Sequence, residues 1–452
     1  MTTGSRKTTP TSPLLDVIAD HKRGKAIGIA SLCTANRFAL QAGMKQALQD
    51  RALVCIEATS NQVDQFGGYS GLTPERFAAM VHEIAAAAGL PAGRIVMGGD
   101  HLGPNAWRDK DARTAMALSR DLVRAYVLSG FTKIHLDASM PCADDTVAGR
   151  VELATRTVAE RTAELCAAAE EAYAERPDGS PAPLYVVGTE VPRPGGALEE
   201  LSVVQATAPA DAEETLLETQ RAFDGRGLHQ AWKRVIAVVV QPGVEFGDQT
   251  VIAYDREKAR ALSALIAARD HLVYEAHSTD YQTPPALRQM VEDHFAILKV
   301  GPWLTFAFRE AVFALEAIER EWLAPKSVVL SGLAATLDKV MVTQPKYWAR
   351  YYRGDASDLA LARKYSFSDR SRYYWTNPLV QQALTRLMDN LARFPPPLCL
   401  LSQYLPVQCE AVMQGRIAGT PPALILDKIM EVTGKYAYAC GMQAAASSAF
   451  PR

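Results

Sequence analysis

Residues able to bind a divalent metal ion stand in three separate segments of this 452-residue sequence. Asp100 and His101 are adjacent in a glycine-flanked segment, while Glu190 and His277 each lie far along the chain. Two imidazoles and one carboxylate with an open position make a site that polarises a carbonyl group. We therefore predict a divalent metal ion, zinc by preference, held by His101, Glu190 and His277, with Asp100 as the general acid/base. A single histidine is more often a core residue, so the prediction requires these side chains to converge.

Eight further polar or backbone groups could contact a substrate. They are Glu57, Asn61, Asp137, Ser139, Gln241, Asp280, Lys299 and Gly301. Asp137 could orient a ligand histidine or bind sugar hydroxyls, and its structural alternative is a carboxylate that accepts backbone N–H bonds. Backbone N–H groups near Gly301, with Lys299 beside them, could hold a phosphate group, because the loops after the last two strands of a barrel often do so.

Short apolar runs that alternate with amphipathic helical stretches must position these residues. Eight runs suit strands: 26–32, 53–58, 95–99, 133–137, 184–187, 235–240, 272–276 and 295–300. Runs that are apolar throughout are typical of parallel strands buried on both faces. Eight such units within about 300 residues favour a closed barrel over an open sheet. We predict an α/β fold, a TIM (β/α)₈ barrel, with the polar residues that follow each run gathered on one rim.

The alternation of strands and helices ends near residue 323. We predict a disordered N-terminal tail over residues 1–13, the barrel over 14–323, and a helical C-terminal extension packed on the barrel over 324–452. The extension holds two aromatic clusters, at 346–352 and 372–375. Burial in the core is the favoured interpretation for most of these rings, and a partner surface is the alternative.

The composition argues against several function classes. With 48 basic and 50 acidic side chains, the net charge of −2 provides no broad attraction for nucleic acid or anionic lipid. Seven cysteines without a C-x-x-C pair argue against a disulfide framework. No signal peptide or membrane span is evident, so we expect a cytoplasmic protein without membrane association. P-loop, dinucleotide-binding and nucleophile-elbow motifs are also missing, so we expect no nucleotide cofactor.

Longer motifs carry a family resemblance from about residue 21 to the C-terminus. In the barrel they are Ile56-Glu-Ala-Thr-Ser-Asn-Gln62, Gly98-Gly-Asp-His-Leu-Gly-Pro-Asn105, Lys133-Ile-His-Leu-Asp-Ala-Ser-Met140, Val239-Val-Gln-Pro-Gly-Val-Glu-Phe246 and Tyr274-Glu-Ala-His-Ser-Thr-Asp-Tyr-Gln-Thr283. In the extension they are Phe367-Ser-Asp-Arg370 and Arg372-Tyr-Tyr-Trp375. By these motifs the chain resembles the Z-type subunit of class II D-tagatose-1,6-bisphosphate aldolase, a subunit described as non-catalytic.

The resemblance implies a TIM barrel, a role in the catabolism of galactitol, N-acetylgalactosamine or related sugars, and a catalytic Y-type partner subunit. That partner cleaves tagatose bisphosphate into dihydroxyacetone phosphate and glyceraldehyde 3-phosphate. Some relatives have been called tagatose 6-phosphate kinases, but no nucleotide-binding motif supports kinase activity here.

Catalytic class II aldolases pair an aspartate with a zinc-binding histidine after the third strand, and Asp100 with His101 is similar to that pair. The position of His277 is similar to another of their zinc ligands. After the sixth strand they place a further histidine, whereas this chain has Gln241. An amide is a poorer zinc ligand than an imidazole.

Two interpretations follow from the resemblance and the rim. In the favoured one the chain is an accessory, non-catalytic subunit that stabilises the aldolase partner. In the alternative it is itself a divalent-metal-dependent ketose or ketose-phosphate aldolase or 4-epimerase. In either case we expect the rim to bind a metal ion or a ketose phosphate. Assembly as a homo-oligomer is left open.

Overall fold

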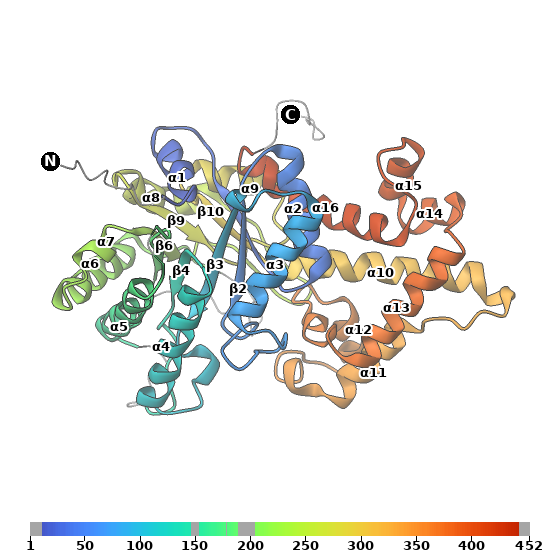
Figure 1. Cartoon of the computed structure of the whole chain (residues 1–452), viewed down its shortest axis with the longest axis horizontal. Helices are drawn as coiled ribbons and strands as arrows, with labels where there is room; N and C mark the ends of the chain where they lie inside the picture. Colours follow the sequence, from blue (N-terminus) through green and yellow to red (C-terminus); the bar gives the residue numbers. More distant parts are fainter. Residues whose placement is uncertain (1–10, 146–152, 178, 189–203, 443–452) are drawn as a thin grey trace.

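A closed barrel of eight parallel strands forms the centre of the molecule, in the order β1-β10-β9-β6-β5-β4-β3-β2 (Figure 1). The computed structural model describes residues 11–145, 153–177, 179–188 and 204–442. The barrel strands are β1 (Ile29–Cys33), β2 (Val54–Thr59), β3 (Ile95–Leu102), β4 (Lys133–Leu136), β5 (Leu184–Val187), β6 (Val235–Val240), β9 (Val273–Ala276) and β10 (Ile297–Val300). Each predicted run overlaps one of these strands, so the predicted TIM barrel is confirmed. A separate hairpin pairs β7 (Glu245–Phe246) with β8 (Val251–Ile252).

Helices surround the barrel and bury the outer faces of its strands. They are α2 (Arg37–Asp50), α3 (Pro74–Ala88), α4 (Ala112–Leu128), α5 (Thr155–Ala174), α6 (Pro209–Gly225), α7 (His229–Trp232), α8 (Arg256–Ala267), α9 (Pro284–Glu292) and α10 (Pro302–Leu323), with short 3₁₀ helices η1 (Ala92–Arg94) and η2 (Pro104–Trp107). Local sequence sets their ends, as in α3. Its Thr73 side chain caps the first turn, Pro74 begins the helix, and Gly89 ends it at φ 73°.

Helix α1 (Leu14–Lys22) closes the N-terminal end of the barrel. Leu14 and Ile18 are buried in an apolar cluster with Ile29, Val96 and Ile297, residues near the beginnings of their strands. The N-terminal end of the barrel is therefore apolar, and the polar side chains lie at the opposite end, where barrels of this kind carry their sites. Most of the predicted tail, residues 1–10, lies outside the described residues.

The C-terminal region is helical, as predicted. It contains η3 (Ala324–Lys326), α11 (Leu333–Thr343), η4 (Pro345–Tyr347), α12 (Ala356–Tyr365), η5 (Arg370–Tyr374), α13 (Pro378–Arg393), α14 (Leu398–Tyr404), α15 (Pro406–Met413) and α16 (Pro421–Ala439). In Figure 1, α11 to α15 gather on one side of the barrel, and α16 returns to pack against α2, α9 and α10. Helix η5 brings Arg372 and Tyr373 to the barrel mouth.

The aromatic clusters of this region divide between core and surface. Trp348, Tyr352 and Trp375 are buried, which agrees with the core interpretation. Tyr347 and Tyr351 instead line an open groove. Among the described helices, none has the length and hydropathy required to cross a bilayer.

Candidate active site at the barrel mouth

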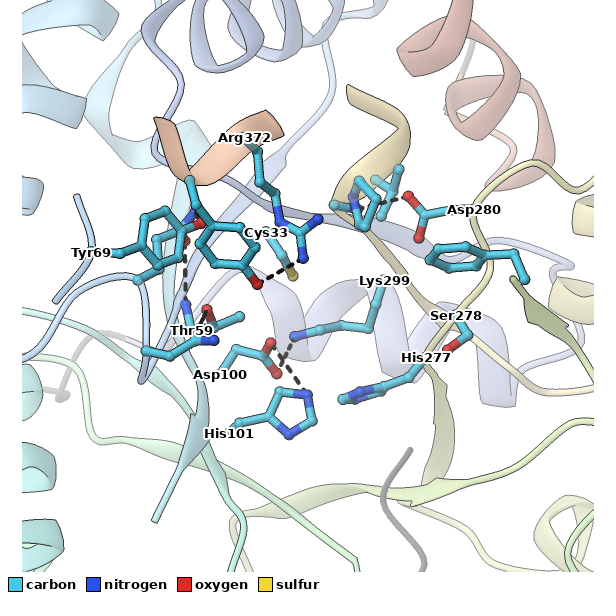
Figure 2. A pocket seen from close by; sticks show the side chains of 17 residues that line it. Cys33, Thr59, Tyr69, Asp100, His101, His277, Ser278, Asp280, Lys299 and Arg372 are labelled. Carbon is cyan, nitrogen blue, oxygen red and sulfur yellow. Dashed lines mark hydrogen bonds and ion pairs between the residues drawn. The ribbon is translucent and has the colours of Figure 1, made fainter. Parts of the chain in front are cut away.

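A cavity of about 70 Å³ opens at the C-terminal ends of the strands (Figure 2). Its lining includes Asp100 and His101 from β3, His277 after β9, and Lys299 from β10. Figure 2 shows Lys299 pointing at Asp100, with His101 and His277 facing each other close by. The structure therefore brings together Asp100, His101 and His277, three residues that the sequence analysis selected from distant segments.

Glycines make room for this arrangement. A Cβ atom on Gly98 would lie 2.6 Å from Cγ of Glu57, and one on Gly103 would lie within bonding distance of the Asp137 carbonyl oxygen. Any larger residue at these two positions would push β3 away from its neighbours. Gly98 thus allows the buried Glu57 side chain to pack directly against the strand that carries Asp100, and Gly103 allows the backbone after β4 to approach closely.

The Asp100 carboxylate accepts contacts from two directions. His135 Nδ1 lies 3.0 Å from one of its oxygens, and Lys299 Nζ lies 2.7 Å from the same oxygen. Burial alone would raise the pKa of Asp100, but His101 and His135 outweigh that effect and hold the pKa below its ordinary value. The carboxylate is therefore ionised near neutral pH and able to accept a proton.

His101 is fixed by a carboxylate behind it. Its Nδ1 lies 2.7 Å from Asp137 Oδ2, and the other oxygen of Asp137 accepts hydrogen bonds from the backbone N–H and hydroxyl of Ser139. Its backbone has φ 50°, a left-handed conformation that is uncommon for a residue with a side chain. Burial by itself would lower the pKa of His101, but Asp100 and Asp137 outweigh it and raise the pKa to about 9. Binding of a metal ion to His101 would therefore release a proton, because a ligand imidazole must be neutral. Asp137 and Ser139 do not line the cavity, and their contacts orient His101.

Two further residues join the histidines, and the sequence analysis missed both. Asp100, His135, Glu275 and His277 each offer a nitrogen or oxygen atom, and these four atoms lie within 4.8 Å of one another. Glu275 Oε1 lies 3.0 Å from His277 Nε2. The alternation of residues along the strands could have indicated both of them. His135 lies two residues from Lys133, and Glu275 lies two residues from His277. Residues spaced by two point to the same face of a strand.

The residues present fit a divalent metal ion. The clustered atoms are imidazole nitrogens and carboxylate oxygens, which zinc and similar ions prefer. His135 Nε2 is buried without a hydrogen-bond partner, so a bound ion or ligand would satisfy it. Burial lowers the pKa of His277 and favours its neutral form, which is the form that binds metals. His101 packs against this cluster, with its ring centre 4.8 Å from that of His277. Glu190, the third predicted ligand, lies outside the described residues.

A buried ion network lies beneath the cluster. Lys133 is fully buried, and its Nζ lies 2.5 Å from a carboxylate oxygen of Glu57 and 2.5 Å from one of Glu275. Lys299 forms a close ion pair with Glu57. Glu57, predicted as a substrate contact, is therefore enclosed below the cavity and paired with two lysines. Two ammonium groups balance part of the carboxylate charge that would otherwise be costly to bury.

The predicted phosphate site at the start of α10 is filled by the chain itself. Asp280 Oδ1 accepts hydrogen bonds from the backbone N–H groups of Gly301 and Trp303, at 3.1 and 2.8 Å. Burial raises the pKa of Asp280 to about 6. Lys299 is also paired with carboxylates. Neither the backbone N–H of Gly301 nor the Lys299 ammonium is therefore free to bind a phosphate group.

A different cation reaches the cavity from the C-terminal region. Arg372 lines it, and its guanidinium donates to the Tyr373 hydroxyl at 2.9 Å (Figure 2). Among the described residues no carboxylate forms an ion pair with Arg372. In the sequence this residue lies in an aromatic cluster, and no local pattern indicates that the segment folds back over the barrel.

Two amide residues behave differently. Asn61 lines the cavity, and its Oδ1 accepts a hydrogen bond from the Thr59 hydroxyl at 2.6 Å. Gln241 does not line the cavity, because its Oε1 accepts the backbone N–H groups of Gly243 and Val244 at 2.8 and 3.0 Å. Its side chain shapes a loop.

Known proteins of one family match this chain along nearly its whole length. Residues 14–441 match a family described as D-tagatose-1,6-bisphosphate aldolase subunit GatZ/KbaZ-like. The chain is 49% identical over 430 residues to D-tagatose-1,6-bisphosphate aldolase subunit GatZ of Klebsiella pneumoniae subsp. pneumoniae, which covers 95% of this chain and 100% of that relative. The crystal structure of a probable tagatose 6 phosphate kinase from Sinorhizobium meliloti 1021 is 43% identical, with a TM-score of 0.82 over 91% of this chain and 100% of that one.

Proposed function

Because this chain belongs to the GatZ/KbaZ-like family of D-tagatose-1,6-bisphosphate aldolase subunits, we propose that it is the accessory subunit of such an aldolase. In this role it binds and stabilises a catalytic Y-type subunit in hexitol or amino-sugar catabolism. The relative from Klebsiella, matched over its full length, is named as a subunit of D-tagatose-1,6-bisphosphate aldolase.

The main support for this proposal is the hydrogen bonding of the Gln241 side chain. It stands where catalytic class II aldolases are expected to place a zinc-binding histidine, and its amide oxygen is already bonded to two backbone N–H groups. A side chain held in this way cannot act as the missing ligand without rebuilding the loop. The chain therefore lacks one element of the aldolase site and would depend on its partner for aldol cleavage.

A second candidate is a metal-dependent activity of the chain itself, either aldol cleavage or 4-epimerisation of a ketose phosphate. The specific support is the buried donor cluster together with the His101–Asp137 pair. We propose that His277, His135, Glu275 and His101 would supply the ligands of a divalent ion, which when bound would polarise a ketose carbonyl. Asp100, held ionised, would accept a proton from a substrate hydroxyl. Arg372 would attract an anionic substituent of the substrate.

One experiment with two parts separates the candidates. Co-expression with a Y-type aldolase subunit should raise that subunit's activity and melting temperature, and His277→Ala should leave both effects intact if the role is accessory. Purified chain loaded with a divalent metal should convert a panel of ketose phosphates if it is catalytic, and the same substitution should abolish turnover. No effect on the partner would contradict the accessory role, and no turnover with any loaded metal would contradict the second candidate.

A further inference from the structure

A second cavity lies beside the mouth and shares Asn61, Tyr69 and Tyr373 with it. Its volume is about 450 Å³, within the size range of small-molecule sites. We call it the basic groove, because its lining includes Arg108, Lys346, Arg350 and Arg370, together with Tyr69, Tyr347, Tyr351 and Tyr373. It runs between the barrel loops and the segment that contains η4 and η5.

The groove concentrates positive charge in a chain whose net charge is −2. Among its described lining residues the four cations face one carboxylate, Asp64, whose Oδ1 accepts the backbone N–H groups of Phe66 and Gly68. Within the described part of the chain, none of the four cations forms an ion pair. Lys346 and Arg350 lie 5.2 and 5.5 Å from tyrosine ring centres. Rings attract cations but do not neutralise them.

Arg370 is the most informative of these cations, because it is 2% exposed. One of its terminal nitrogens donates to the Tyr347 carbonyl at 3.1 Å, and its Nε is buried without a partner. Burial, together with the neighbouring Arg372, lowers the pKa of Arg370. A buried guanidinium is costly unless an anion pairs with it. The Tyr351 ring lies against this guanidinium, with the ring centre 3.0 Å from its central carbon, but a ring does not neutralise the charge. An anion bound in the groove would pair with Arg370.

Tyrosine rings line the groove and form what we call its tyrosine wall. Tyr347 and Tyr373 stack with ring centres 4.8 Å apart and planes 8° apart, and Tyr69 meets Tyr373 edge-on at 4.5 Å. Such a wall combines apolar ring faces with polar hydroxyls. This surface matches a sugar, which has an apolar C–H face and hydroxyls at its edge.

We propose that the basic groove binds the phosphoryl group of a phosphorylated sugar, with the sugar packed on the tyrosine wall. The inference rests on the proposed function, since it assigns a ligand class to the same rim. The phosphoryl group can belong to a molecule that also occupies the mouth, because the two cavities share a wall, or to a separate sugar phosphate.

Calorimetric titration of the full chain tests the proposal with fructose 6-phosphate, inorganic phosphate and unphosphorylated fructose as probes. The test variant is Lys346→Ala/Arg350→Ala, because both side chains are exposed and their loss should not impair folding. The matched control is Arg353→Ala, an exposed arginine that does not line the groove. The double variant should weaken fructose 6-phosphate binding about tenfold or more, as expected when charged hydrogen bonds are lost, and the control should change it less than about twofold.

Titration with fructose 1,6-bisphosphate identifies the source of the phosphoryl group. One molecule per chain, sensitive to both His277→Ala and the groove variant, supports a ligand that spans the two cavities. Two molecules per chain, with one site sensitive to the groove variant, supports a separate ligand. The proposal is overturned if the double variant binds all probes as the unmodified chain does, or if fructose binds as tightly as fructose 6-phosphate. The assay requires neither turnover nor the partner subunit, so its failure is distinct from failure of the proposed function.

Discussion

His101 and Asp137 face each other inside the barrel, with 2.7 Å between the imidazole Nδ1 and the carboxylate Oδ2. His101 lies near the end of β3 and Asp137 directly follows the neighbouring strand β4, and Ser139 fixes Asp137 from the other side. A carboxylate that holds one imidazole nitrogen leaves the other free for a metal or substrate. We therefore predict that the mouth binds a metal ion or a substrate in addition to any contact with a partner subunit.

Asp137→Asn should weaken metal binding by about tenfold to a hundredfold, the usual cost of losing a carboxylate that orients a ligand histidine. Equilibrium dialysis against zinc would measure it. Asp109→Asn, at an exposed position outside the cavity, is the control and should bind metal like the unmodified chain. Equal zinc affinity in the Asp137 and control variants would remove His101 from the metal site.

Lys133→Met should destabilise the fold by about 3–5 kcal/mol, because it leaves Glu57 and Glu275 buried without their shared cation. Denaturant unfolding near neutral pH would give the free energy of unfolding. The control is Lys233→Met, at an exposed position, where a change below about 0.5 kcal/mol is expected. A loss below about 1 kcal/mol at Lys133 would mean that the network is hydrated or differently protonated.

Glu245 should make the protein less stable as the pH rises. Burial raises the pKa of this carboxyl from 4.5 to about 7. The folded state thus holds the proton more tightly than the unfolded state, and the free energy of unfolding falls between about pH 4.5 and pH 7. The loss amounts to about 3 kcal/mol at most, at 1.36 kcal/mol per pH unit.

Glu245→Gln isolates this contribution. The variant should match the unmodified chain near pH 4.5 and exceed its stability at pH 8, whereas Glu214→Gln, at an exposed helical position, should follow the unmodified curve. Urea unfolding at the two pH values would supply the comparison. Parallel stability curves for Glu245→Gln and the unmodified chain would show that Glu245 does not titrate as described.

Removal of a bound metal should lower the melting temperature. An ion that binds the folded state stabilises it by about 2.7 kcal/mol at a hundred times its dissociation constant. Thermal unfolding with zinc and with a chelator should therefore differ, and the difference should vanish in His277→Ala. A chelator effect that persists in that variant would place the ion elsewhere.

The sequence predicts the barrel well because its strands are buried on both faces and their apolar runs are therefore continuous. It also predicts that Asp100 and His277 meet, since every strand of a barrel ends on the same rim. How far below the rim a strand residue lies is harder to predict. Glu57 lies below the mouth with Lys133, and an alternating pattern alone does not distinguish a residue inside the lumen from one at the rim.

Contacts with the C-terminal region could not be predicted from local patterns. Arg372 and Arg370 reach the rim because η5 folds back across the barrel, and that path depends on long-range packing. The prediction of a phosphate site near Gly301 did not anticipate a competing carboxylate, and Asp280 occupies those backbone N–H groups. The anion sites that we infer draw most of their cations from the C-terminal region, namely Arg372 at the mouth and Lys346, Arg350 and Arg370 in the groove.

The central claim is that the barrel mouth is a site for a divalent metal ion. Anomalous diffraction from crystals soaked in zinc tests it most directly. The account predicts a peak about 2.0–2.1 Å from imidazole nitrogens of the mouth, the usual zinc–nitrogen distance, with His277 among the ligands. A map with zinc peaks only at surface histidines, and none between His101, His135 and His277, would contradict it.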